Sequence, residues 1–244
     1  MEVLNLVYYH SSEKFMIRDK LKDNNYFDLY LSNQIEDLAY YEKTLYQIEA
    51  SKEKVIKSLK NTIFRISVEI LIARYSKGDN LAVIKEEYIN CIPKFKAAFS
   101  EIIDTNSVQF IALGTLLNID LSEDEELLSL IEQYDISYSL VEIFVNKNTD
   151  IDVRLYKDIK RFRPWIAEFY NKPDEREAII SKQLSNWYRS QRSSYFFGYD
   201  KEEEPFYFGY WALEIAALVK VLNIPDDSFS DHKYYPYDLV HFGG

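Results

Sequence analysis

The sequence predicts an all-α protein, in which long antiparallel helices of the N-terminal half pack against a set of shorter helices in the C-terminal half. Two observations lead to this prediction. Glycine and proline are scarce, with six of each in 244 residues, whereas turn-dense β-sandwiches and barrels use more of both. Apolar residues also recur every three or four positions along much of the chain, which is the period of a helix. The share of hydrophobic residues, 47%, is typical of a folded domain.

Two long amphipathic helices are expected first, over residues 25–50 and 52–77, because each has an apolar stripe along one face. Gly78 follows the second helix, at the position where a left-handed C-cap is expected. A third helix is expected over 81–103. Pro93 falls inside it, and a proline there removes a backbone hydrogen bond, so this helix should be kinked or split.

Shorter helices make up the rest of the chain. They are expected over 108–118, 123–133, 138–147, 151–171, 174–189 and 206–222. The run VEIFV at 141–145 could also form a strand, but the helical interpretation is favoured. A seam between the halves is expected near 104–121, which gives an N-terminal helical region, 1–121, and a C-terminal helical region, 122–244.

The charge of the chain limits its partners. There are 29 Lys and Arg against 40 Asp and Glu, a formal net charge of −11. Such a field repels phosphate backbones and anionic membrane surfaces, so direct binding to nucleic acid or to a membrane is not expected. The same field speeds the encounter with a basic protein, which is therefore the kind of partner to expect.

The cellular location is expected to be the cytoplasm. Cys91 is the only cysteine, so the chain cannot form an internal disulfide, which suits a reducing compartment. The opening residues MEVLNLVYYH lack the basic region of a secretory signal, and no window approaches the ~18 apolar residues of a membrane span.

Catalytic chemistry is not indicated by any motif. The three histidines, His10, His232 and His241, are scattered, and no metalloprotease, zinc-finger, phosphate-loop or nucleophile-elbow pattern accompanies them. We therefore expect no catalytic residues, no metal and no cofactor. The alternative is a hydrolase or metal enzyme that uses His232 and His241 with nearby aspartates. These are Asp227, Asp231 and Asp238.

The helix expected over 206–222 is apolar nearly all round, so Glu214 within it should be buried. An unpaired buried carboxylate is unfavourable. An ion pair with an arginine or lysine from 154–163 is therefore expected for Glu214.

One stretch carries a family resemblance. Residues 207–242 read YFGYWALEIAALVKVLNIPDDSFSDHKYYPYDLVHF. They resemble the C-terminal signature of the PoNi-type immunity proteins, in which a G-Y-W-x-x-E-x-x-A helix precedes Asp-Asp-Ser and Y-Y-P-Y-D-L. RDKLKDNNYFDLYLSNQIEDL, which begins at Arg18, and IARYSKGDNL are similar to the N-terminal region of that family.

The resemblance implies an all-α, non-catalytic bacterial antitoxin, which binds and neutralises a cognate PoNe-type DNase toxin used in competition between bacteria. An acidic inhibitor could cover the basic DNA-binding face of such a toxin. The alternative within binding proteins is a helical scaffold for a peptide or regulatory protein unrelated to toxins.

The signature residues are expected to fix the fold rather than to select the toxin, because proteins that bind different toxins share them. They are Arg18, Asp19, Gly209, Trp211, Glu214, Tyr235, Pro236, Tyr237 and Asp238. Toxin contacts are expected instead at two acidic clusters, one of which includes a tyrosine. These candidate residues are Glu123, Asp124, Glu125 and Glu126, and Tyr199, Asp200, Glu202, Glu203 and Glu204.

Overall fold

The structure is a computed structural model that describes residues 16–100 and 102–243. Within these ranges the chain folds into α-helices and short 3-10 turns, and the prediction of an all-α fold is confirmed. The helices are α1 (Asn24–Gln47), α2 (Glu53–Lys77), α3 (Leu81–Ala98), α4 (Thr105–Leu116), α5 (Glu125–Gln133), α6 (Ser139–Phe144), α7 (Arg163–Asn171), α8 (Arg176–Ser190), α9 (Leu213–Val221) and α10 (Tyr237–Val240). None of the helices in this part of the chain is long and apolar enough to cross a bilayer.

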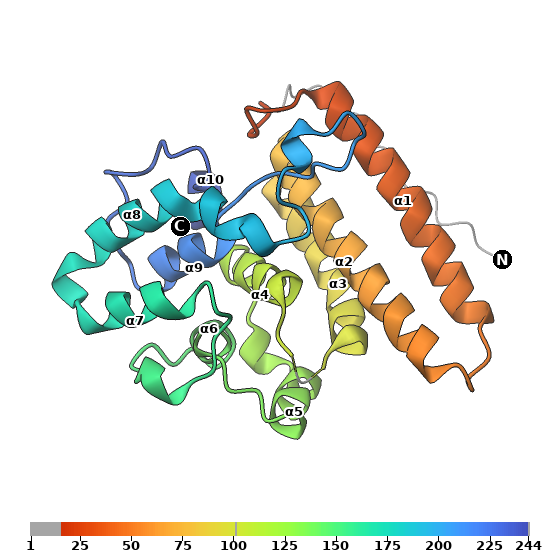
Figure 1. The fold of residues 1–244 in the computed structure, drawn as a ribbon, viewed down its shortest axis with the longest axis horizontal. Coiled ribbons are helices and arrows are strands. Elements are labelled where there is room, and N and C mark those ends of the chain that lie inside the picture. Colours follow the sequence, from red (N-terminus) through yellow and green to blue (C-terminus); the bar gives the residue numbers. More distant parts are fainter. Residues whose placement is uncertain (1–15, 101, 244) are drawn as a thin grey trace.

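The two long N-terminal helices form an antiparallel hairpin at one side of the molecule, and α3 packs beside α2 (Figure 1). Asp23 caps α1 by accepting a hydrogen bond from the backbone N–H of Tyr26. Gly78 ends α2 in the left-handed conformation, with φ 103°, as its position in the sequence predicts. In α2, burial begins at Ile63, so the connecting end of the hairpin projects from the core.

The third helix differs from its prediction at two points. It ends at Ala98 rather than near residue 103, and it continues through Pro93 without being split. Pro93 lies on the exposed side of α3, where water can hydrogen-bond the backbone carbonyl that the proline leaves without a donor.

The core lies where α4 and α9 pack against each other between the hairpin and the C-terminal helices (Figure 1). Both helices are buried on nearly all sides. Lys220, in the last turn of α9, connects the C-terminal end of α4 to the segment after α10. Its Nζ donates to the backbone oxygens of Leu116 (2.7 Å) and Phe242 (3.1 Å). Since α4 falls in the predicted N-terminal region and α9 in the C-terminal one, the division at residue 121 remains a prediction.

The helix predicted over 151–171 is wrong in its first half. Only a 3-10 turn, Val153–Leu155, precedes α7, which begins at Arg163. The backbone N–H of Lys157 donates to the carbonyl of Ser137 instead of to a helical partner. Asp158 accepts hydrogen bonds from the backbone and hydroxyl of Ser139, so this segment is held against the start of α6.

The helix predicted over 206–222 begins only at Leu213. Gly209 interrupts the pattern, because its φ of 117° lies outside the helical region. Residues 206–212 instead run extended across α2, where the carbonyl of Phe208 accepts a hydrogen bond from Ser76 Oγ (3.0 Å). This crossing brings the C-terminal segment onto the N-terminal hairpin.

Candidate partner-binding surfaces

The first predicted acidic cluster, Glu123 to Glu126, lies at the start of α5 and is partly used inside the protein. Asp124 caps α5 by accepting from the backbone N–H of Leu127 (2.9 Å). Lys96 binds both Asp124 (3.0 Å) and Glu126 (2.7 Å). Burial opposes ionisation of Asp124, but the Leu127 and Lys96 hydrogen bonds outweigh it and lower its pKa. Glu123 and Glu125 are exposed and form no ion pair with the described residues, whereas Glu126 is exposed but paired with Lys96.

The second predicted cluster forms an exposed loop, residues 199–206, which we call the acidic loop. Asp200 anchors this loop, because its Oδ1 accepts hydrogen bonds from the hydroxyls of Tyr188 (3.2 Å) and Tyr210 (3.1 Å). Glu202, Glu203 and Glu204 are exposed and form no ion pair within the described part of the chain. Three free carboxylates are therefore presented to solvent on an anchored loop.

Aromatic side chains lie beside these carboxylates. Phe206 is 50% exposed and Tyr195 is 39% exposed. The ring of Tyr199 lies between them, with centroid distances of 5.7 Å to Phe206 and 6.3 Å to Tyr195. Aromatic residues are enriched in protein–protein interfaces relative to the rest of the protein surface. The sequence prediction included Tyr199 but missed Phe206 and Tyr195. The chain has 21 tyrosines and 15 phenylalanines, and the sequence does not show which of them are exposed.

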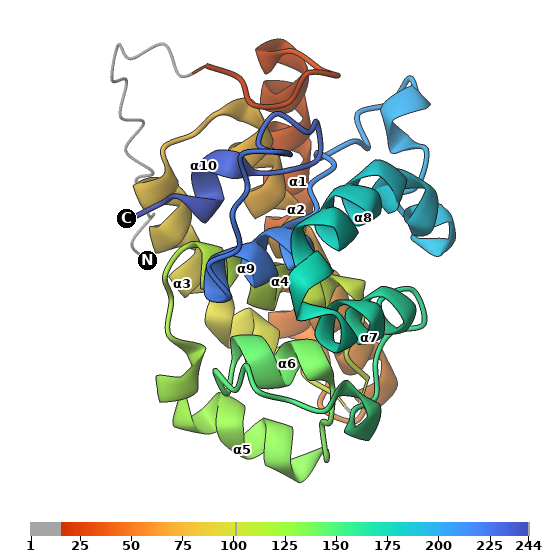
Figure 2. The same cartoon turned by 90° about the vertical axis from the view of Figure 1, so that its left-hand side faces the viewer.

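The two acidic clusters are not brought together. Figures 1 and 2 place α5 at one end of the molecule and the acidic loop near the opposite end, beside the start of α1. The two clusters are therefore separate candidates for a partner-binding surface.

The Arg18 clasp, by which we mean Arg18, Tyr75 and Asp238, joins segments distant in sequence. Arg18 Nε donates to Asp238 Oδ2 (2.5 Å), and the Tyr75 hydroxyl donates to the other carboxylate oxygen. The Arg18 guanidinium also lies 4.7 Å from the centre of the Tyr75 ring and donates to the carbonyls of Tyr75 and Asp79. Two signature residues thus contact each other directly across α2.

Other signature residues meet at the same crossing. Asp19 accepts a hydrogen bond from the Tyr207 hydroxyl (2.5 Å). Trp211 Nε1 donates to Ser76 Oγ (2.9 Å). Gly209 lies directly against this serine, since a Cβ placed on it would come within 2.0 Å of Ser76 Oγ. Only glycine fits both the backbone angle and this space.

Glu214 is buried, as expected, but the predicted ion pair with a residue of 154–163 is wrong. Its Oε1 accepts a hydrogen bond from Trp187 Nε1 (2.9 Å), and it forms no salt bridge with any described residue. Burial raises the pKa of Glu214, while the charge of Arg161 partly opposes this shift. Arg161 itself lies before α7, outside any helix, and donates to Ser194 Oγ (2.9 Å). The aromatic donor on α8 therefore replaces the cation that the sequence suggested.

The histidines do not assemble a metal site within the described residues, which contain no group of three or more potential ligands. His241 Nε2 lies 2.9 Å from Asp226 Oδ2, to which the signature residue Tyr235 also donates (2.8 Å). His232 Nδ1 instead accepts from the backbone N–H of Tyr234 (3.3 Å). His10 lies outside the described residues.

The aspartates predicted for that alternative site are also spread out. Asp227 and Asp231 are exposed, and Asp238 belongs to the Arg18 clasp. Pro236 directly precedes α10, which Tyr237 begins and which carries Asp238. The arrangement thus offers a histidine–aspartate pair but does not join it to the second histidine.

A buried polar network connects the hairpin to the segment before the acidic loop. Glu69 on α2 is buried, binds Arg65 (2.6 Å) and accepts from the Tyr195 hydroxyl (2.7 Å). The same hydroxyl lies 3.0 Å from Asn106 Oδ1 on α4. Burial raises the pKa of Glu69, although Arg65 favours its ionised form. Tyr195 therefore links α2, α4 and the acidic loop.

Comparison with known proteins assigns the chain to a family. No curated protein and no solved structure matches it. The family model described as PoNe immunity protein (PoNi), N-terminal, matches residues 11–129. The model described as PoNe immunity proteins (PoNi), C-terminal, matches residues 139–239. Because the two matches together cover nearly the whole chain, the protein belongs to the family of PoNe immunity proteins.

Proposed function

We propose that this protein is a bacterial antitoxin, which acts in the cytoplasm by binding and neutralising a cognate PoNe-type DNase toxin. The family assignment carries this proposal, since the matched models are those of immunity proteins against PoNe. An immunity protein acts by binding, so the absence of a catalytic motif in the sequence agrees with this function.

Inhibition is proposed to occur at the DNA-binding face of the toxin. A protein that cuts DNA must present basic side chains to the phosphates. An inhibitor with net charge −11 is attracted to such a face. Of the two acidic clusters, the acidic loop supports this role better, because Glu202, Glu203 and Glu204 have no internal partners among the described residues and lie beside Phe206.

The proposal can be tested with the nuclease encoded beside this gene. Plasmid cleavage would be measured at varied ratios of the two proteins, with an unrelated acidic helical protein as control. Cleavage should stop near a one-to-one ratio, and the control should have no effect. Undiminished cleavage with no complex formed would reject the proposed function.

A further inference from the structure

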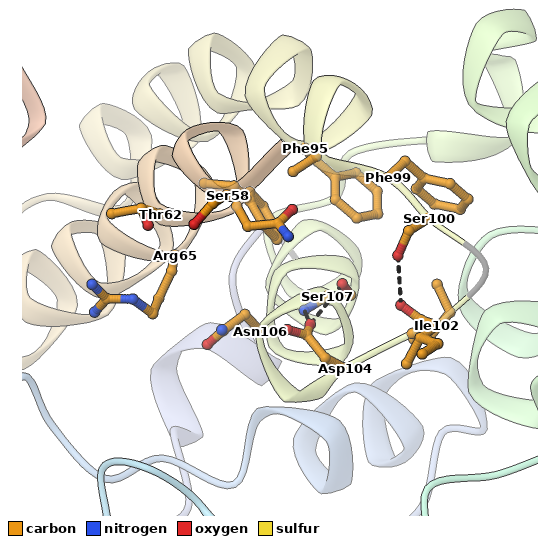
Figure 3. Close-up of a pocket in the computed structure, with 14 residues that line it drawn as sticks. Ser58, Thr62, Arg65, Phe95, Phe99, Ser100, Ile102, Asp104, Asn106 and Ser107 are labelled. Carbon is orange, nitrogen blue, oxygen red and sulfur yellow. Dashed lines mark hydrogen bonds between the residues drawn. The ribbon is translucent and has the colours of Figure 1, made fainter. Parts of the chain in front are cut away.

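A pocket of about 250 Å³ lies between α2, the end of α3 and the start of α4 (Figure 3). Arg65 and other polar residues of α2 line one side, and Asp104 and Asn106 line the other. The aromatic rings of Phe95 and Phe99, at the end of α3, form another part of the wall. We call this site the Asp104 pocket.

Of the two charged residues that line the pocket, Arg65 and Asp104, only Asp104 forms no ion pair with the described residues. Asp104 caps α4, and its Oδ1 accepts from both the backbone N–H and the hydroxyl of Ser107, each at 2.8 Å. Its other carboxylate oxygen has no hydrogen bond or ion pair with the described residues, and the side chain is exposed. Arg65, in contrast, is neutralised by the buried Glu69 at 2.6 Å. A cationic ligand is therefore favoured near Asp104.

The aromatic wall narrows the choice of cation. Phe99 is half-buried and packs edge-on against Phe95 at a centroid distance of 5.3 Å. A planar guanidinium can stack on an aromatic ring and pair with a carboxylate at the same time, whereas a lysine ammonium is a compact, strongly hydrated point charge. Because Phe99 and Asp104 line the same pocket, the pocket suits an arginine side chain.

The pocket also adjoins the acidic loop. Arg65 and Asn106, which line the pocket, both contact Tyr195: the Arg65 guanidinium lies 5.7 Å from the ring centre, and Asn106 Oδ1 lies 3.0 Å from the hydroxyl. The Tyr195 ring is 6.3 Å from Tyr199 of the acidic loop. A partner that covers the acidic loop would therefore extend to the pocket.

We propose that the Asp104 pocket receives an arginine side chain of the basic partner, which pairs with Asp104 and stacks on Phe99. This inference rests on the proposed function, because that function supplies a partner with a cationic surface. The acidic loop attracts a basic partner in general, and the pocket adds one specific contact. We expect this contact to slow dissociation, since paired charges in a recess chiefly affect the dissociation rate.

The Asp104→Asn variant tests this inference cleanly. Asparagine caps helices about as well as aspartate, so α4 should keep its cap while the pocket loses its charge. Binding to the neighbouring nuclease, measured by surface plasmon resonance, should weaken about 10-fold or more, mainly through faster dissociation. Asp23→Asn is the matched control, since Asp23 caps α1 in the same way and the variant loses the same charge outside the pocket. Because α1 begins beside the acidic loop, this variant should affect association at most and leave the dissociation rate unchanged.

A second readout identifies the arginine itself. Phenylglyoxal modifies exposed arginines, and mass spectrometry of the treated complex should find one nuclease arginine protected by the wild-type protein but not by Asp104→Asn. If the wild type binds and the two variants dissociate equally slowly, the pocket assignment is wrong and the proposed function stands. If the wild-type protein does not bind the nuclease at all, the proposed function fails and the pocket assignment fails with it.

Discussion

At the scale of single residues, the buried carboxylate of Glu214 has an uncharged partner, the indole N–H of Trp187 on α8. Only the arrangement of α8 beside α9 puts Trp187 within reach, and the spacing of residues along one helix cannot specify that. Asp104 is a second case. It lies four residues before the predicted helix 108–118 and caps α4, and the sequence alone could not predict that it also lines a pocket.

The Glu214→Gln variant should be more stable than the wild type at neutral pH. Burial raises the pKa of Glu214 in the folded state, so the folded protein holds this proton more tightly than the unfolded chain does. Stability is therefore lost as pH rises above the unfolded pKa of about 4.3 and through the folded pKa. Glutamine avoids this loss and can still accept from Trp187. Urea unfolding at pH 7 and pH 4 should show an advantage for the variant that is larger at pH 7. An equal difference at both pH values would contradict this prediction.

Gly209→Ala and Gly198→Ala form a matched pair. Both glycines have left-handed φ angles, 117° and 93°, so alanine is strained at both. At Gly198 no atom lies within 4 Å of the new Cβ, whereas at Gly209 Ser76 Oγ lies at 2.0 Å. We expect Gly209→Ala to lower the free energy of unfolding by about 1–3 kcal/mol more than Gly198→Ala does. Equal losses in chemical denaturation would show that the contact with Ser76 is unimportant.

At the scale of helices and loops, periodicity predicted the N-terminal hairpin well, although only α1 packs along one face, whereas residues 66–73 of α2 are buried without interruption. It failed at 206–212 and 151–162. The apolar spacing of 206–222 continues unbroken through Gly209, but the extended segment is held by α2 and by a hydrogen bond from the backbone N–H of Ala212 to the Tyr234 carbonyl (2.8 Å). Such partners come from distant parts of the chain, and a local pattern contains no information about them.

The Arg18→Ala variant should loosen α10. Arg18 contributes a charge-assisted hydrogen bond to Asp238, and bonds of this type are worth about 1.5–3 kcal/mol. We expect amide hydrogen exchange in Tyr237–Val240 to become on the order of 10-fold faster. Arg154→Ala is the control, because Arg154 pairs only with Asp152 of its own turn among the described residues. Unchanged exchange in α10 would mean that packing alone holds this helix.

At the scale of the whole molecule, the charge of the chain was available from the sequence, but its distribution was not. Nothing in the sequence distinguishes the two acidic clusters. In the fold, Lys96 neutralises part of one cluster and the two lie at opposite ends. Because the clusters are far apart, the effect of net charge on the association rate can be distinguished from the effect of one specific surface.

Replacing Glu202, Glu203 and Glu204 with lysine should slow association with the nuclease about 10-fold at low salt and weaken the salt dependence of the rate. The comparison is a variant with lysine at Glu123, Glu125 and Glu132, which are exposed residues at the α5 end. Both variants change the net charge equally. Stopped-flow association rates that fall equally would indicate only a long-range effect, and a fall confined to the α5 variant would place the contact there.

The Arg18 clasp also has a consequence for biosynthesis. Arg18 and Asp238 are 220 positions apart, so at a translation rate of about 5–20 residues per second Asp238 is added about 10–45 s after Arg18. Until the last part of this interval the nascent chain lacks Tyr207 and Trp211, and throughout it the chain lacks Asp238. These residues contact Asp19, Ser76 and Arg18, respectively, in the complete fold. The final arrangement of the hairpin can therefore be reached only after the C-terminal segment leaves the ribosome.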